Sequence, residues 1–117
     1  MIMPEHVHFL LLPPDDIKLG VLIGQLEARA AMSILSRLRS RGSRVLSRPD
    51  GSPAVWQRRC YDHNCRTPEI VIGKLKYCHD NPVKRGLVSH PEDRPWSSCR
   101  WYNGGYKGEF EIDGIEM

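Results

Sequence analysis

Residues 6–12, with the sequence HVHFLLL, constrain the fold of this chain more than any other segment. Polar and apolar side chains alternate and then give way to a continuous apolar run, a pattern that predicts a β-strand with at least one buried face. Pro13 and Pro14 end the strand. Such a strand needs neighbouring strands to bond its backbone and a packed layer to cover its apolar side. We therefore predict a fold that contains a sheet.

A helix is predicted after this strand. From residue 17 to about residue 41, apolar side chains recur every three or four positions. Asp15 or Asp16 is expected to cap its first turn, and Gly42 to end it. Residues 42–54 are dense in glycine, proline and serine and predict a loop.

A second strand and a second helix complete the predicted order. Residues 55–64, VWQRRCYDHN, predict the strand. Thr67 is the expected N-cap of the helix, Pro68 suits its first position, and Pro82 is expected to end or bend it near residue 81. Residues 89–105 predict a loop, and residues 110–117 either a short strand or a frayed end.

Charge in this 117-residue chain is unevenly distributed, although the net charge is only +3. Between residues 28 and 61 a single acid, Asp50, accompanies eight arginines: Arg29, Arg37, Arg39, Arg41, Arg44, Arg48, Arg58 and Arg59. This density favours a polyanionic partner such as nucleic acid, while a solvated helix face followed by a basic loop is the alternative. The sequence has no apolar run of about 20 residues and no signal-peptide pattern, so we expect a cytoplasmic protein with no membrane partner.

Two histidines and the second predicted helix carry the residues suited to chemistry. His6 and His8 are two apart on the predicted strand and share one face, as half of a metal site would. Tyr77 and Asn81 are one helical turn apart, with Lys74 on the same face. The alternatives are ordinary surface histidines, a tyrosine at the edge of the core, and an asparagine that caps the helix.

Together these residues suggest phosphoryl chemistry. Two imidazoles and an amide oxygen can hold a divalent ion, and a tyrosine one turn from a ligand can attack a phosphorus atom. A zinc site is the competing hypothesis, and its ligands would be Cys60, His63, Cys65 and either Cys78 or His79.

The sequence resembles a known family over about residues 3–102. MPEHVH resembles the HUH motif (His, bulky apolar residue, His) of transposases that act on single-stranded DNA. WQRRCYDHNCRTPE, KLKYCHDNPVKRGLV and PEDRPWSSCRWY, in that order, resemble the REP-associated tyrosine transposases of that superfamily.

The resemblance implies a role for each candidate residue. His6, His8 and Asn81 match ligands of Mg²⁺ or Mn²⁺, and Tyr77 matches a nucleophile that takes a 5′-phosphotyrosine link and frees a 3′-hydroxyl. The implied partner is single-stranded or hairpin DNA. Its expected contacts are Lys74, Arg37, Arg41, Arg44, Arg58 and Arg59. The implied fold is α+β: a ferredoxin-like sandwich in which helices pack on an antiparallel sheet.

In this family a strand–helix–strand portion precedes the HUH strand. We therefore interpret residues 1–102 as a partial transposase-like domain and residues 103–117 as a C-terminal tail. Either the chain is a truncated remnant, or its start is misassigned, or self-association or a partner chain completes the sheet. We expect little or no cleavage from the 117-residue chain. The alternative function is that of an inactive remnant that only binds hairpin or single-stranded DNA.

Overall fold

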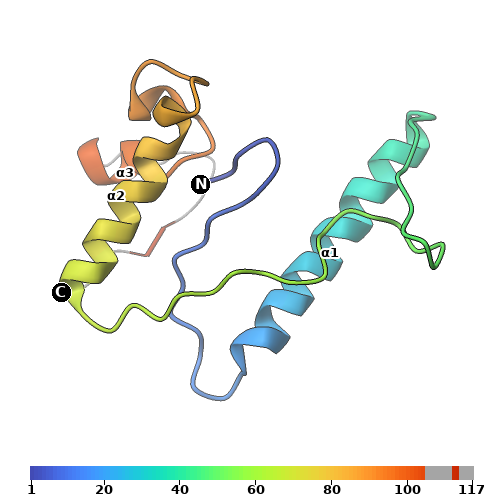
Figure 1. Cartoon of the computed structure of the whole chain (residues 1–117), viewed down its shortest axis with the longest axis horizontal. Helices are drawn as coiled ribbons and strands as arrows, with labels where there is room; N and C mark the ends of the chain where they lie inside the picture. Colours follow the sequence, from blue (N-terminus) through green and yellow to red (C-terminus); the bar gives the residue numbers. More distant parts are fainter. Residues whose placement is uncertain (105–111, 114–117) are drawn as a thin grey trace. The chain divides into compact units, whose positions relative to one another are not determined.

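The computed structural model describes residues 1–104 and 112–113, which fall into two compact units. One unit consists of Met1–Leu11 and His63–Met117, and the other of Leu12–Asp62. The helical elements are α1 (Leu19–Ser40), α2 (Pro68–Lys84), the short 3₁₀ helix η1 (Pro91–Asp93) and α3 (Cys99–Gly104) (Figure 1). Each unit contains one long helix. The unit of α2 holds His6, His8, Lys74, Tyr77 and Asn81, and the other unit holds the candidate arginines.

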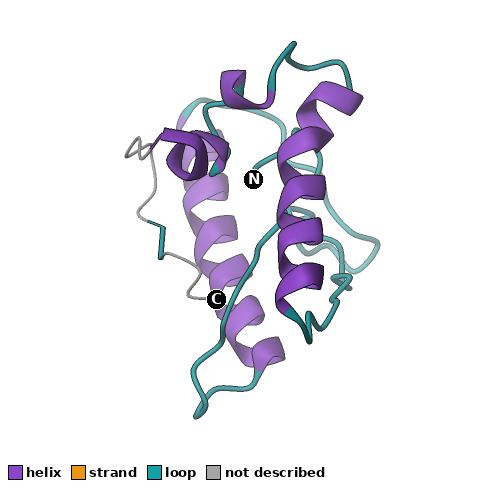
Figure 2. Cartoon of the chain, turned by 90° about the vertical axis from the view of Figure 1, so that its left-hand side faces the viewer, coloured by secondary structure: helices purple, strands orange, loops and turns teal. Residues whose placement is uncertain are grey.

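The predicted sheet is absent from the described residues, which form helices, loops and turns (Figure 2). The ferredoxin-like α+β prediction is therefore wrong, as are the strands predicted at residues 6–12 and 55–64. Extended pairing is limited to two isolated antiparallel bridges, Ile2 with Val7 and Ser47 with Pro53. A helix satisfies its own backbone groups, whereas an extended segment becomes a strand only beside a partner. No described segment pairs with residues 9–12, and the Leu12 side chain is 97% exposed.

A tight antiparallel turn replaces the first predicted strand. The His8 N–H donates to the Met1 carbonyl over 2.9 Å, and the Met3 N–H donates to the His6 carbonyl over 2.9 Å. The Met3 side chain is buried. This turn holds the two histidines close together in space, which the predicted strand was also expected to do.

Helix α2 begins where the sequence predicts. The Thr67 hydroxyl accepts a hydrogen bond from the Ile70 N–H over 3.3 Å, and Pro68 occupies the first turn. The helix does not end at Pro82 but continues to Lys84. The Arg85 N–H still donates to the Asn81 carbonyl over 2.9 Å, so the proline removes one backbone bond without breaking the helix.

The segment after α2 folds back onto it. Gly86 has a φ of +71°, which allows the chain to reverse at the end of the helix. The Pro91–Asp93 turn packs against α2, and α3 packs against that turn, although the sequence predicted a loop here. His79 of α2 and Ser98 are joined by a 2.8 Å hydrogen bond between Nε2 and Oγ. The predicted tail lies mostly outside the described residues, as does the possible strand at residues 110–117.

Helix α1 forms over nearly the predicted range, with a different start. The N-cap is Lys18, with no capping side chain, so the predicted aspartate caps are wrong. Gly42, at a φ of +64°, follows the helix as expected. No residue of α1 is buried, and within its unit the Trp56 Nε1–H donates to the Glu27 carbonyl over 2.9 Å. By length and composition alone α1 qualifies as a membrane-crossing helix, as signal sequences and core helices of soluble proteins also do.

Candidate active site

Three polar side chains converge within the unit of α2. The Nε2 atoms of His6 and His8 are 2.9 Å apart. The Asn81 amide nitrogen lies 3.0 Å from His8 Nε2 and 3.5 Å from His6 Nε2, although Asn81 is more than 70 positions away in the sequence. The turn at the start of the chain supplies the histidines, and α2 supplies the amide. These three atoms form the triangle that we call the His–His–Asn triad.

Two edges of the triad, 2.9 Å and 3.0 Å long, have the dimensions of an octahedral metal site, and the third edge is 3.5 Å long. Two ligand atoms that each lie ~2.1 Å from an ion, at a right angle, are ~3.0 Å apart. The Asn81 nitrogen and oxygen exchange places when the amide is flipped, and the flipped amide presents an oxygen ligand. Two facing Nε2 atoms repel if both carry lone pairs, and a cation between them would remove that repulsion. The residues present therefore fit a divalent ion.

The His–His–Asn triad contains no carboxylate and no thiolate. Among residues 1–104 and 112–113, no group of three or more His, Cys, Asp or Glu residues is placed to hold a metal ion. The zinc site considered from the sequence, with Cys60, His63, Cys65 and Cys78 or His79, is therefore not assembled there.

A carboxylate orients the first histidine. Glu5 Oε1 lies 3.1 Å from His6 Nδ1, and the Arg85 guanidinium donates to the same oxygen over 2.5 Å. A proton on Nδ1 then bonds to Glu5 and leaves the lone pair of Nε2 facing His8. The hydrogen bond from Arg85 is the main reason that the pKa of Glu5 lies below its usual value. Sequence analysis missed both residues, since 80 positions separate them.

His8 is held in its neutral form. Burial lowers the pKa of His8 below the ordinary value of 6.5, and the neighbouring His6 lowers it further. A neutral imidazole is the form that binds a metal ion. The environment of His8 therefore suits a ligand at neutral pH.

Tyr77 lies beside the triad, as its spacing from Asn81 predicts. The ring centroids of Tyr77 and His8 are 5.9 Å apart and the rings meet edge to face. The Lys84 Nζ atom lies 5.5 Å from the centre of the Tyr77 ring. Half of the Tyr77 side chain is exposed, so the residue is accessible to a large substrate.

The other tyrosines are less suited to this role. Tyr61 is 90% exposed in the unit of α1 and does not lie on a strand. Tyr102 lies in α3 rather than in the expected loop, with its ring centroid 5.7 Å from that of His79. Tyr106 is outside the described residues.

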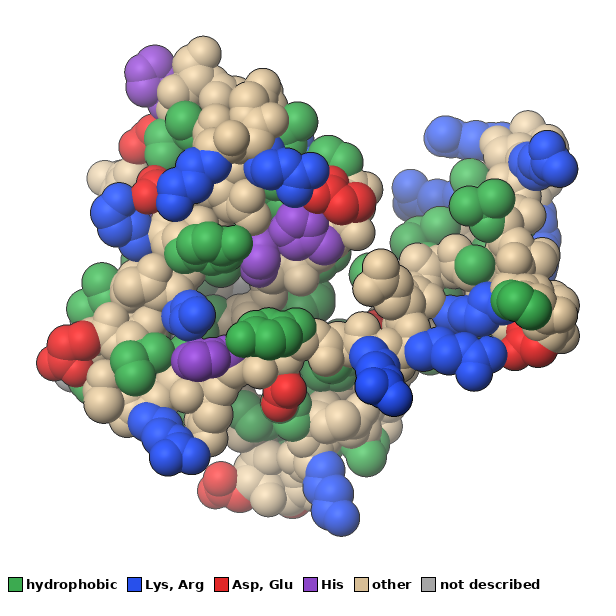
Figure 3. All heavy atoms as spheres, viewed as in Figure 1, with side chains coloured by type: hydrophobic (Ala, Val, Ile, Leu, Met, Phe, Trp, Pro, Cys, Tyr) green, Lys and Arg blue, Asp and Glu red, His purple; other side chains and the backbone are tan. Residues whose placement is uncertain are grey.

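The basic residues predicted to contact DNA divide between the two units. Lys74 is exposed on α2, one turn before Tyr77. The five candidate arginines are all exposed and belong to the unit of α1, where several Lys and Arg side chains project into solvent (Figure 3). They are Arg37, Arg41, Arg44, Arg58 and Arg59. Arg58 is partly engaged, because it forms a 3.0 Å ion pair with Asp50.

One curated relative supports the resemblance that the motifs suggested. A Haemophilus influenzae protein described as "Putative REP-associated tyrosine transposase" is 32% identical over 99 residues, which is 83% of this chain. The chain belongs to the REP-associated tyrosine transposase family. It spans about half of that relative, 54% of its length. No family model and no solved structure matches the chain.

Proposed function

We propose that this chain carries the DNA-cleaving centre of a REP-associated tyrosine transposase. In this proposal it cuts and rejoins single-stranded DNA through a transient link between Tyr77 and a 5′-phosphate. The proposal revises the expectation of little or no cleavage from the 117-residue chain, because Tyr77 and the triad already lie together in the unit of α2. One observation carries the proposal: Tyr77, the family's nucleophile by motif, lies against His8 of a triad with metal-site dimensions, at a ring-centroid distance of 5.9 Å.

The proposed reaction is an in-line displacement in which atoms and charge balance. The Tyr77 oxygen attacks the phosphorus, the bond from phosphorus to the 3′-oxygen breaks, and the departing 3′-hydroxyl takes the proton that Tyr77 loses. The phosphodiester is conserved, so a 3′-hydroxyl of another strand can reverse the step and join. No water or external energy source is consumed.

The side chains around Tyr77 fit this step. His6, His8 and Asn81 would hold Mg²⁺ or Mn²⁺, which when bound polarises a phosphate oxygen and offsets the developing charge. The Lys84 ammonium lies 5.5 Å from the centre of the Tyr77 ring, where it would attract the negatively charged phosphate of the DNA. The exposed arginines of the other unit would bind the DNA backbone. Their affinity for DNA would fall as the salt concentration rises.

The direction of the link provides the test. A pool of hairpin oligonucleotides with random single-stranded flanks is incubated with the 117-residue chain and Mn²⁺, with the label at either the 3′ or the 5′ end. Cleavage through a 5′-phosphotyrosine transfers the 3′ label to the protein and leaves the 5′ label on a free fragment. Tyr77→Phe should abolish the labelled protein while DNA binding, measured separately, persists. Tyr61→Phe is the matched control, because Tyr61 is exposed and distant from the triad in sequence.

Two outcomes would overturn the proposal. An adduct that survives Tyr77→Phe would place the nucleophile elsewhere. DNA that binds without any adduct from the parent chain would favour the alternative of a binding-only remnant, which the absence of a sheet from the described residues makes a real competitor.

A further inference from the structure

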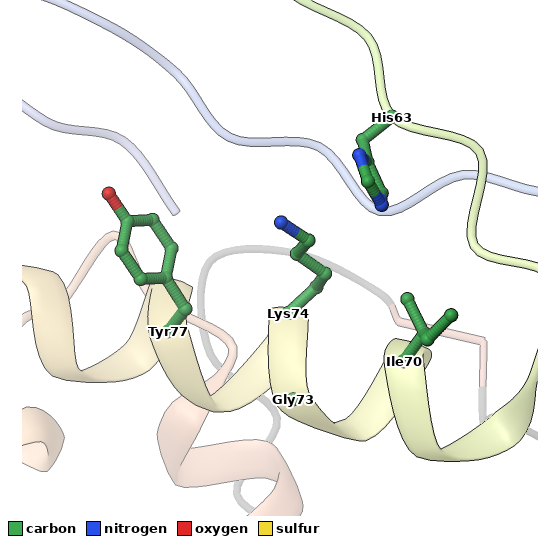
Figure 4. Close-up of a pocket in the computed structure, with 5 residues that line it drawn as sticks. All are labelled: His63, Ile70, Gly73, Lys74 and Tyr77. Atoms are coloured by element: carbon green, nitrogen blue, oxygen red, sulfur yellow. The ribbon is translucent and has the colours of Figure 1, made fainter.

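An open hollow lies beside Tyr77, on the side of α2 that leads toward the start of the helix. Its volume is about 420 Å³, and it is lined by His63, Ile70, Gly73, Lys74 and Tyr77. In Figure 4, Ile70, Lys74 and Tyr77 follow one another along one side of α2, and His63 faces them from the segment that precedes the helix. All five residues belong to the same unit as the triad.

Gly73 adds no side chain to this hollow, although glycine carries a cost inside a helix. Glycine inside a helix destabilises it by comparison with alanine, because glycine loses more backbone freedom on folding. A Cβ atom at position 73 would meet no other atom within 4 Å, so packing does not require a glycine here. Helical φ values do not require one either, since positive φ occurs only at Gly42, Gly51 and Gly86 among the described residues. What the glycine does leave is room in the hollow.

The lining combines two chemistries. The Ile70 side chain and the Cα atom of Gly73 offer an apolar surface, and the Lys74 ammonium and His63 imidazole offer groups that bind an anion. Lys74 makes no ion pair with an acid within the described residues, whereas Lys76 on the same helix is paired with Asp80 at 2.7 Å. A single nucleotide has this combination of a flat apolar base and a phosphate.

We propose that the hollow holds one nucleotide of the DNA strand, next to the phosphate that Tyr77 attacks. The base lies on Ile70 over Gly73, and its phosphate binds Lys74 and His63. This inference rests on the proposed function for the position of the attacked phosphate. It adds His63 and Gly73 to the substrate-binding residues, and gives the site a means of holding the strand in register with the nucleophile.

Filling the hollow without disturbing the fold is the direct test. Gly73→Leu places a side chain in the open space, and leucine favours a helix more than glycine does, so loss of the fold is not expected. Gly24→Leu is the matched control, since a Cβ there also meets nothing within 4 Å and Gly24 lies in α1. Lys74→Gln tests the phosphate contact, with Lys76→Gln as its control on the same helix.

Two readouts separate this inference from the proposed function. The first is the affinity for a single-stranded oligonucleotide pool without divalent ions, and the second is the Mn²⁺-dependent transfer of the 3′ label. Gly73→Leu and Lys74→Gln should each lower the affinity about tenfold and reduce label transfer, while both controls match the parent.

Each outcome decides one of the two proposals. Unchanged affinity and label transfer in both Gly73→Leu and Lys74→Gln would overturn the nucleotide pocket and leave the proposed function intact. Weakened binding in these variants, with no label transfer from the parent chain, would support the pocket and overturn the cleavage reaction.

Discussion

His6 illustrates how a single imidazole is given two separate partners. Its Nδ1 atom bonds to Glu5, which is itself bound by Arg85, and its Nε2 atom faces His8 and Asn81. A carboxylate behind a ligating histidine fixes its tautomer and raises its basicity, and loss of such a partner commonly weakens metal binding 10- to 100-fold, as a rough guide. Glu5 is therefore a positioning residue for the triad.

The effect of Glu5 is testable by metal titration. Glu5→Ala should weaken Mn²⁺ binding by about tenfold, because the His6 ring loses its anchor, and calorimetry measures the change directly. His6→Ala combined with His8→Ala should abolish binding at this site.

Asp15→Asn is the control for lost negative charge, since Asp15 belongs to the other unit. Binding by the double histidine variant that equals binding by the parent would show that the triad is not the metal site. Unchanged affinity in Glu5→Ala would show that its bond to His6 does not support the ligand.

Helix α2 carries residues of the candidate site and residues of the buried core. Tyr77 and Asn81 belong to the triad side, whereas His79 is buried and bonds to Ser98, which precedes α3. Burial lowers the pKa of His79 below 6.5, so the imidazole is neutral in the folded unit at pH 7. The same helix therefore holds the site in place through a buried imidazole that is neutral at pH 7.

Acid should lower the stability of the folded unit, because protonation would place a charge on the buried His79 ring. In the unfolded chain His79 takes up a proton with an ordinary pKa of 6.5, and in the folded chain only at lower pH. The unfolded state thus binds more protons, and the free energy of unfolding falls as the pH drops below 6.5 and through the lower folded pKa. His79→Gln should flatten part of this dependence, measured by denaturant unfolding followed by circular dichroism between about pH 5 and pH 8.

Part of the pH dependence should remain in that variant, because His8 has a lowered pKa for the same reason. His63→Gln is the control, since His63 is exposed. An identical pH dependence in His79→Gln and the parent would contradict the role given to the buried imidazole.

Among the residues that the structure describes, burial is confined to the unit of α2. The buried residues there are Met3, His79, Asn81, Pro82 and Cys99. No residue between positions 12 and 62 is buried, and large apolar side chains there are exposed, with Met32 73% and Leu46 73% exposed. Isolated helices are marginal in water, and their stability in proteins comes mainly from a packed apolar face.

Hydrogen exchange should therefore distinguish the two long helices. The amides of α1 are expected to exchange faster than those of α2, because α1 has no buried residue and α2 has three. Mass spectrometry of peptic fragments measures both in one sample of the full chain.

Repeating the measurement over a range of protein concentrations tests for self-association. Protection of α1 that increases with concentration would indicate that a second copy covers its apolar side chains. Equal protection of α1 and α2 at the lowest concentration would contradict the expectation that α1 is the less stable helix.

Local chemistry was sufficient to predict much of this protein from its sequence. Thr67 and Pro68 begin α2 through hydrogen bonds and a backbone angle that involve only nearby residues. The spacing of Tyr77 and Asn81 places them on one face by helical geometry alone, and Gly42 follows α1 as predicted. The family motif identified the same residues, and the curated relative confirmed the family.

Tertiary structure alone decided the features that join residues far apart in the sequence. A strand exists only where another segment accepts and donates its hydrogen bonds, so the apolar run at residues 6–12 could not determine a sheet by itself. Three further features follow the same rule: Asn81 approaches His6 and His8, Glu5 bonds to Arg85, and His63 lies opposite Lys74. Each joins groups whose separation in space is set by how the chain folds back on α2, and no local pattern encodes that path.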